Sequence, residues 1–273
     1  MLHNKIRTLD FVSIFSEYGA FTIIALIFCS TAAGFIDSIV GGGGLIQLPG
    51  TFILFPKAPL PTLFGTNKIA SLLGTASSAA QYSRRVKFDF RVLVPVAICS
   101  GIASWLGAKA VSNINPNMLK PLILIVLIAI AVYTFLKKDL GAVQTKQLTV
   151  QKQVLFGCLL AVLVGFYDGF FGPGTGSFFV MGFVFFLGFE FIKASAYAKL
   201  INCMTNLSAL IVFIHKGNYI LTIAILMAVC NVTGNLIGTR LALKRGNAFV
   251  RIFFLMVVGL LILRFGYDIL LKK

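Results

Sequence analysis

Two lysines and two aspartates occupy stretches of this sequence that are otherwise almost entirely apolar. Asp37 precedes the glycine run at 41–44, and Asp168 precedes a second glycine-rich break. Lys68 and Lys199 each lie about two helical turns inside an apolar stretch. A charged side chain surrounded by hydrocarbon costs several kcal/mol and marks a functional site by default. Such groups attract ions, relay protons or form ion pairs, and the sequence has to supply elements that hold them in place.

The two glycine-rich breaks have the composition of backbone anion sites. DSIVGGGGLIQ in the first half matches DGFFGPGTGSF in the second. Glycine lets the backbone turn and approach a ligand closely, and a helix that begins after it presents unpaired N–H groups and a partial positive charge. Two such helix starts would bind an anionic substrate, although the glycines could instead serve only tight helix packing. The predicted backbone contributors are Gly41, Gly42, Gly43, Gly44, Gly172, Gly174, Thr175 and Gly176.

Polar residues share helical faces with the two lysines. Residues at steps of three and four lie on one face of a helix, and here they are Ser71 and Thr75 after Lys68, and Asn202 and Asn206 after Lys199. Together with Asn67 they would donate hydrogen bonds to a tetrahedral or pyramidal oxyanion, while the lysines supply charge. The alternative is structural: the polar faces join helices, and each lysine pairs with the aspartate of its own half, Lys68 with Asp37 and Lys199 with Asp168.

The aspartates have three candidate roles. They could cap the broken helices, pair with the lysines, or take up protons, as carboxylates do in proton-coupled transporters. Asp37 and Asp168 are therefore predicted to act in coupling or in structure, and the sequence leaves that choice open.

No catalytic or metal-binding pattern is present in the sequence. It has no nucleophile elbow, no Walker motif and no cluster of histidines and carboxylates. Its five cysteines lie in apolar stretches without CxxC spacing. The chain is therefore predicted not to be an enzyme and to have no catalytic residues, no metal and no cofactor.

The composition implies that these charged residues lie within a membrane. Of the 273 residues, 58% are hydrophobic and only 12% are charged, and apolar runs long enough to span a bilayer recur along the chain. The net charge of +16 resides mostly in short loops, as the positive-inside rule describes, so nucleic acid is not a predicted partner. The predicted fold is an all-α polytopic protein of the bacterial inner membrane, and its oligomeric state is left open.

Ten apolar elements are predicted, arranged in two halves of five. They cover residues 18–39, 45–55, 61–83, 90–111, 117–136, 154–170, 177–188, 192–215, 220–243 and 247–270. The first repeat covers residues 1–136 with a short lead at 1–17, a cytoplasmic linker covers 137–153, and the second repeat covers 154–273.

The halves are related by one constant offset. Asp168 lies 131 residues after Asp37, and Lys199 lies 131 residues after Lys68. Five elements is an odd number, so the second copy enters the membrane from the opposite side. This inverted repeat is common in secondary transporters. The conclusion still holds if each short second element folds back on the first as a re-entrant hairpin, because a hairpin removes two crossings.

Loop charge predicts the orientation. The loops after the third, fifth and ninth elements carry most of the lysines and arginines, and all three lie on one side in this topology. The positive-inside rule places that side in the cytoplasm, with both termini outside.

Four segments together resemble a known family. They are AGFIDSIVGGGGLIQLP, GTNKIASLLGTASSAAQY, VGFYDGFFGPGTGSFFV and AKLINCMTNLSALIVF, and they resemble the TauE/SafE sulfite-exporter family, also called the 4-toluene sulfonate uptake permeases (TSUP). The resemblance covers nearly the whole chain and is strongest to the branch described only as membrane transporters. It implies secondary transport, often export, of sulfur-containing anions such as sulfite, sulfonates and sulfoacetate.

The sequence therefore predicts a secondary transporter that moves a small anion, sulfite or an organosulfonate, by alternating access. Asp37 and Asp168 either couple transport to protons or serve the structure. One alternative is a cation transporter or channel in which Asp37 and Asp168 bind the cation. Another is a membrane assembly subunit that transports nothing and uses its polar faces only to join helices.

Overall fold

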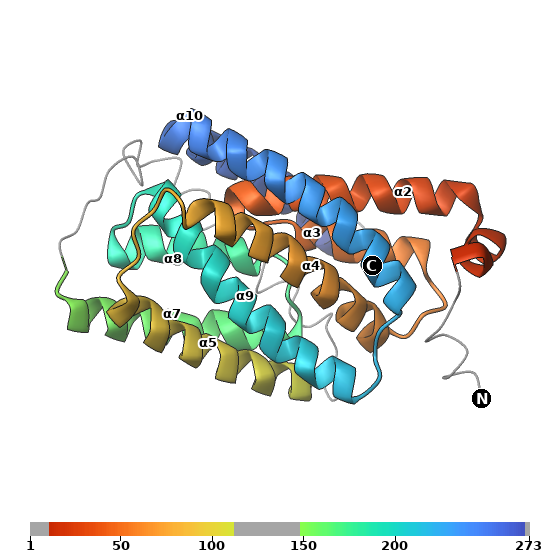
Figure 1. Ribbon diagram of the computed structural model, residues 1–273, viewed down its shortest axis with the longest axis horizontal. Coiled ribbons are helices and arrows are strands. Elements are labelled where there is room, and N and C mark those ends of the chain that lie inside the picture. The colour runs from red at the N-terminus through yellow and green to blue at the C-terminus, as the bar shows by residue number, and fades with distance from the viewer. Residues whose placement is uncertain (1–10, 112–147, 271–273) are drawn as a thin grey trace.

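The computed structural model describes residues 11–111 and 148–270, and all of its regular structure is helical (Figure 1). Eight helices lie in these ranges: α2 Phe11–Val40, α3 Gly44–Leu54, α4 Leu60–Tyr82, α5 Phe90–Ala110, α7 Val150–Phe170, α8 Thr175–Leu187, α9 Phe191–His215 and α10 Leu221–Leu270. The element predicted at 117–136 and most of the predicted linker fall outside the described residues.

Five of the described helices are long and apolar enough to cross a membrane. They are Gly19–Val40, Phe90–Ala110, Val150–Phe170, Phe191–His215 and Leu221–Met256. Large apolar side chains cover their outer surfaces, as Phe21, Phe28 and Leu163 do with more than 70% of their surface exposed. Such a surface suits hydrocarbon rather than water. The prediction of an all-helical, polytopic membrane protein is confirmed.

Two glycines separate helices that otherwise run together. Gly19 in α2 has φ 74° and ψ 161°, so the long helix begins there, close to the predicted start at 18. Gly246 in α10 has φ 77° and ψ −169°, which separates the elements predicted at 220–243 and 247–270. One boundary differs more: α7 begins at Val150, inside the segment 137–153 predicted as linker.

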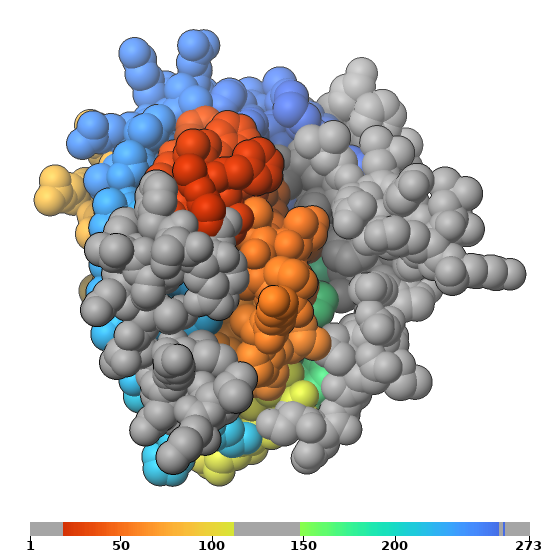
Figure 2. All heavy atoms as spheres, turned by 90° about the vertical axis from the view of Figure 1, so that its right-hand side faces the viewer, coloured from red at the N-terminus to blue at the C-terminus, as the bar shows by residue number. Residues whose placement is uncertain are grey.

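The short helices fold back along the helices that precede them. A Cβ atom placed on Gly50 of α3 would lie 3.4 Å from Sγ of Cys29 in α2. A Cβ atom on Gly182 of α8 would lie 2.4 Å from Cδ2 of Leu160 in α7. Figure 2 shows the beginning of α2 (red) and the end of α3 with its following loop (orange) at the same end of the molecule. Each short element therefore forms a hairpin with the helix before it.

Contacts between helices recur at the offset of 131 residues. A Cβ atom on Gly34 of α2 would lie 2.2 Å from the carbonyl oxygen of Asn231 in α10, and one on Gly165 of α7 would lie 2.6 Å from that of Ser100 in α5. Such close backbone approach requires small residues. Figure 1 shows α2 and α7 running in opposite directions, and likewise α4 and α9. Equivalent helices of the two halves are thus antiparallel.

Helices α4 and α9 occupy the middle of the bundle. They pack against each other, with α2 and α10 on one side and α5 and α7 on the other (Figure 1). The polar faces predicted on these two helices are therefore turned into the protein. Lys68 and Lys199 are both buried, with exposed fractions of 5% and 1%.

Candidate functional site

Four charged side chains form two buried ion pairs that cross between the halves. Nζ of Lys68 lies 2.7 Å from Oδ2 of Asp168, and Nζ of Lys199 lies 2.8 Å from Oδ2 of Asp37. The predicted pairing within each half is therefore wrong. The pairs form between the halves because α4 packs against α9 in the centre of the bundle, and this packing directs each lysine toward the hairpin of the other half.

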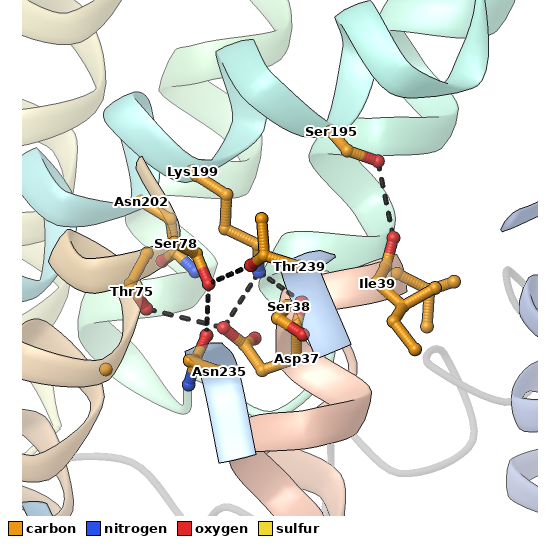
Figure 3. Close-up of polar contacts among 12 residues, drawn as sticks. Asp37, Ser38, Ile39, Thr75, Ser78, Ser195, Lys199, Asn202, Asn235 and Thr239 are labelled. Atoms are coloured by element: carbon orange, nitrogen blue, oxygen red, sulfur yellow. Dashed lines mark hydrogen bonds and ion pairs between the residues drawn. The ribbon is translucent and has the colours of Figure 1, made fainter. Parts of the chain in front are cut away.

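Further hydrogen bonds engage donors and acceptors of the two ion pairs that the pairs themselves leave unused. Lys68 also donates to Oδ1 of Asn206 at 3.0 Å, and Lys199 also donates to the backbone carbonyl of Asp37. The hydroxyl of Thr75 donates to Oδ2 of Asp37 at 3.4 Å. Figure 3 shows Lys199 and Thr75 converging on this carboxylate from different helices. Buried ion pairs persist only when their remaining donors and acceptors find partners, and these contacts provide them.

The two glycine-rich breaks touch each other through their backbones. Gly41 has φ +79°, and a Cβ atom placed on it would lie 2.2 Å from the carbonyl carbon of Gly176. Ser177 donates its N–H to the carbonyl of Gly41 at 3.1 Å and its hydroxyl to the carbonyl of Val40 at 2.9 Å. The N-termini of α3 and α8, which begin at Gly44 and Thr175, are thereby held together near the ion pairs.

A cavity of about 30 Å³ lies between the breaks and the polar faces of α4 and α9. This is the volume of about one water molecule, so a larger guest has to separate existing contacts. Ser71, Thr75 and twelve of the residues predicted for the site line it: Asp37, Gly41, Gly44, Asn67, Lys68, Asp168, Gly172, Gly174, Thr175, Gly176, Asn202 and Asn206.

Three predicted residues do not line this cavity: Gly42, Gly43 and Lys199. A Cβ atom on Gly43 would lie 2.4 Å from the carbonyl oxygen of Ala33, so this glycine serves the turn between α2 and α3. Lys199 contacts the cavity only through Asp37, to which it is paired. The two lysines are thus unequal in the structure, although the sequence pattern makes them equivalent.

Two asparagines at the cavity retain hydrogen-bonding capacity. Oδ1 of Asn67 is buried and has no partner among the described residues. Oδ1 of Asn202 accepts from the hydroxyl of Thr205 at 3.1 Å and from Nδ2 of Asn206 at 3.4 Å. Because its oxygen is engaged, the amide NH₂ is the group that Asn202 has left for a ligand.

A buried polar cluster beside Asp37 was missed by the sequence analysis. The hydroxyl of Ser78 donates to Oδ1 of Asn235 at 2.6 Å, and the hydroxyl of Thr239 donates to that of Ser78 at 2.8 Å (Figure 3). Nδ2 of Asn235 donates to Oδ1 of Asn231 at 2.7 Å. Nδ2 of Asn231 in turn donates to Oε1 of Gln47 in α3 at 2.9 Å. The spacing of Asn231, Asn235 and Thr239 at steps of four was the available signal, because it places them on one helical face.

The side-chain hydrogen bonds of this cluster are not repeated at the equivalent place among the described residues of the other half. The positions offset by 131 residues from Ser78, Asn235 and Thr239 hold Ala209, Ser104 and Ala108. Ser104 there donates to the backbone carbonyl of Thr205 at 2.8 Å rather than to another side chain. The hydrogen bonds that surround the site therefore differ between the two halves.

The change Ser78→Ala is expected to destabilise the protein by about 1–3 kcal/mol, because it leaves the buried oxygen of Asn235 without its donor. Chemical denaturation in detergent measures this loss. Ser83→Ala is the matched control, since its hydroxyl is exposed and bonds only to the carbonyl of Ala80. Equal stability of the two variants would show that the cluster does not stabilise the fold.

A helical bundle in which two broken helices meet at a buried, charged cavity is typical of secondary transporters. The comparisons with known proteins agree with that class. The chain belongs to the TauE/SafE family, because the family model "Sulfite exporter TauE/SafE" matches residues 26–265. The family resemblance inferred from the glycine motifs and the lysine-bearing helices is confirmed, and the chain is a transporter homologue rather than an enzyme.

Bacterial relatives span almost the whole chain. A "Probable membrane transporter protein ORF9" of Sinorhizobium sp is 39% identical over 234 residues, which cover 85% of this chain and 88% of the relative. A "Probable membrane transporter protein YfcA" of Escherichia coli K12 is 32% identical over 247 residues, 89% of each chain. A "Probable membrane transporter protein" of Haemophilus influenzae is 31% identical over 247 residues, which cover 90% of this chain and 95% of the relative. No solved structure matches the chain significantly. The relatives agree with a multi-pass protein of a bacterial membrane.

Proposed function

We propose that this protein is a secondary transporter of a small anion, sulfite or an organosulfonate, that works by alternating access. The observation that carries the proposal is the central cavity, where Lys68, two helix starts and asparagine amides converge. Backbone N–H groups and partial positive charge at helix starts favour an anion. The family description, which names sulfite, supports the choice of substrate.

Binding would begin by competition at Lys68. The cavity holds about one water, so an arriving oxyanion has to displace Asp168 from Lys68 and take its place. Asp168 would then be a buried carboxylate without a cation, which is costly inside a membrane. Uptake of a proton by Asp168 removes that cost, and it couples anion binding to protonation. Lys199, which lies behind Asp37, would act on the site through that carboxylate.

An inverted repeat provides the movement in this proposal. The antiparallel course of α2 and α7, and of α4 and α9, supports two oppositely oriented halves, residues 1–136 and 154–273 joined by the linker. Helices α3 and α8, of 11 and 13 residues, are about 17 and 20 Å long, too short for a hydrocarbon core of about 30 Å. Both hairpins are therefore re-entrant, and rocking of one half against the other would alternate access.

In this proposal both termini lie outside the cell. Arg84 and Arg85, which follow α4, lie beside Lys244 of α10 at one end of the molecule. The positive-inside rule assigns that end to the cytoplasm. With re-entrant hairpins, α2 then begins on the outer side.

Flux of radiolabelled sulfite into proteoliposomes under an imposed pH gradient tests the proposal. Lys68→Ala is expected to lower the flux by about tenfold to a hundredfold, the value of one charge-assisted hydrogen bond. Lys199→Ala is expected to lower it as well, through Asp37. Lys57→Ala is the control, because Lys57 is exposed in the loop between α3 and α4.

Four results would contradict parts of this proposal. Equal flux in the wild type and in Lys68→Ala would remove the lysine from the mechanism. Absence of sulfite flux in well-folded wild type would reject sulfite and move the test to sulfonates and carboxylates. Cation flux that is lost in Asp37→Asn and Asp168→Asn but retained in the lysine variants would establish the cation alternative, and absence of all flux would favour an assembly subunit.

A further inference from the structure

A second, much larger cavity lies at the end of the molecule where α4 ends and α9 begins. Its volume is about 1110 Å³. Six cationic side chains line it, with the single carboxylate of Glu190: Arg84, Arg85, Lys87, Lys193, Arg240 and Lys244. They come from three elements that are distant in sequence, so the fold gathers this charge in one place.

One carboxylate cannot cancel the positive charge of the six cations that line this cavity. Glu190 accepts a hydrogen bond from Nδ2 of Asn247 at 3.0 Å. Nearby Asp89 is engaged by Arg91, whose Nε lies 3.1 Å from its carboxylate; this hydrogen bond lowers the pKa of Asp89 and keeps it ionised. Within residues 11–111 and 148–270, the ion pairs of Lys68, Arg91 and Lys199 use none of the cavity's three arginines. Nζ of Lys193 lies 4.3 Å from the centroid of the Phe189 ring.

The opposite end of the molecule lacks such a concentration of charge. The positions offset by 131 residues from Arg84, Arg85 and Lys87 hold His215, Lys216 and Asn218. The position equivalent to Lys193 holds Thr62, and the equivalent of Arg240 is Lys109, whose ammonium lies 3.4 Å from the centroid of the Trp105 ring. Among the described residues, the charge is therefore concentrated at one end.

A polar face of α4 connects this cavity with the central one. Thr75 lines the central cavity, and Ser77 and Gln81 line the large one. Between them lies Ser78, which forms the buried cluster with Asn235 and Thr239. Thr75 and Gln81 are about 9 Å apart along the helix axis. The cluster therefore lies between the two cavities on this face of α4.

We propose that the large cavity is a vestibule that collects oxyanions and delivers them to the central site past the Ser78–Asn235–Thr239 cluster; this inference rests on the proposed transport function. Clefts lined by one sign of charge raise the local concentration of counter-ions and the rate of their arrival by about tenfold or more. Because the described residues form the vestibule at one end only, it supplies anions to the central site from that end. By the orientation above this end faces the cytoplasm, so the vestibule raises the rate at which cytoplasmic anions reach the central site.

Reactivity of a cysteine in the vestibule measures its potential without any need for transport. In a variant without native cysteines, Ser77→Cys is treated in inside-out vesicles with two methanethiosulfonates, one carrying a sulfonate and one a trimethylammonium group. Both form a mixed disulfide with the cysteine thiolate and release methanesulfinate. Because both reagents react with the same thiolate, the ratio of their rates does not depend on how far the thiol is ionised. The ratio therefore measures the electrostatic potential around the cysteine. Gln81→Cys provides a second position in the same cavity.

The expected ratio of the anionic to the cationic rate, at low ionic strength, is about tenfold or more above that of a free thiol. Neutralising Arg84, Arg85 and Lys244 to glutamine is expected to return it toward the free value, as added salt does. Arg91→Gln is the matched control, because Arg91 lies near the same end but pairs with Asp89. Ala58→Cys, in the loop between α3 and α4 at the opposite end, is labelled in right-side-out vesicles, where that end faces the medium, and is expected to show a smaller preference than Ser77→Cys.

Two results would overturn the proposal. A ratio at Ser77→Cys and Gln81→Cys equal to that of a free thiol would show that the cavity does not collect anions. An elevated ratio that the triple variant abolishes, with no slowing of anion flux, would show that the cavity does not feed the central site. The labelling ratio does not depend on the substrate, so failure of sulfite transport itself would appear in the flux assay alone.

Discussion

Alanine in place of Gly41 is expected to abolish the folded protein. The backbone at this position has φ +79°, which costs a residue with a side chain about 1–3 kcal/mol. The added Cβ atom would also lie 2.2 Å from the carbonyl carbon of Gly176, which is backbone and cannot rotate away. Relief of that overlap would break the hydrogen bond from Ser177 to Gly41, and with it the contact between the two helix starts.

The yield of monodisperse protein after extraction into detergent measures this effect. Gly50→Ala on α3 is the matched control, because its Cβ atom would make an ordinary contact at 3.4 Å with Sγ of Cys29. Wild-type yield and thermal midpoint in Gly41→Ala would show that the two breaks do not meet as described.

The second large effect is expected for Asp168→Ala, which leaves Lys68 buried without its partner. Removing one member of a buried pair costs about 3–5 kcal/mol, whereas replacing both by apolar groups of similar size is often neutral. The double variant Asp168→Ala with Lys68→Met is therefore expected to recover most of the lost stability. It is not expected to recover anion flux, because the cationic group of the cavity is gone.

Denaturation and flux, measured on the same preparations, separate a structural pair from a substrate site. Arg91→Ala serves as the control for stability, since its pair with Asp89 is exposed and such pairs contribute little. A double variant that recovered both stability and transport would reduce Lys68 and Asp168 to structural roles.

The members of the central cavity were predictable because each is locally anomalous. An aspartate, a lysine or four consecutive glycines in an apolar stretch signals a cost that the fold has to offset. The partner of each charge was not predictable. Asp37 and Asp168 are equivalent in a repeated sequence, so pairing within a half and pairing between halves fit it equally well. Only the packing of α4 against α9 decides between them.

Two other features also depend on tertiary contacts. Ser78 and Asn235 are unremarkable residues in their own helices, and only the contact between α4 and α10 joins them in one cluster. The unequal positions of Lys68 and Lys199 are likewise absent from the sequence pattern. A repeat in sequence indicates similar local structure, but the residues that surround each copy are not repeated, and they determine which lysine faces the cavity.

The crossed ion pairs bear on how such a chain could arise by duplication. Each half contains one lysine and one aspartate whose partners both lie in the other half. Two identical copies of a single ancestral half, inserted into the membrane in opposite directions, would form both pairs through one two-fold axis. The ancestor would thus have been a dimer of dual topology that needed no new contact when its gene was duplicated and the two copies fused. Fusion would then have allowed the halves to diverge, as Ser78 and its counterpart Ala209 have done.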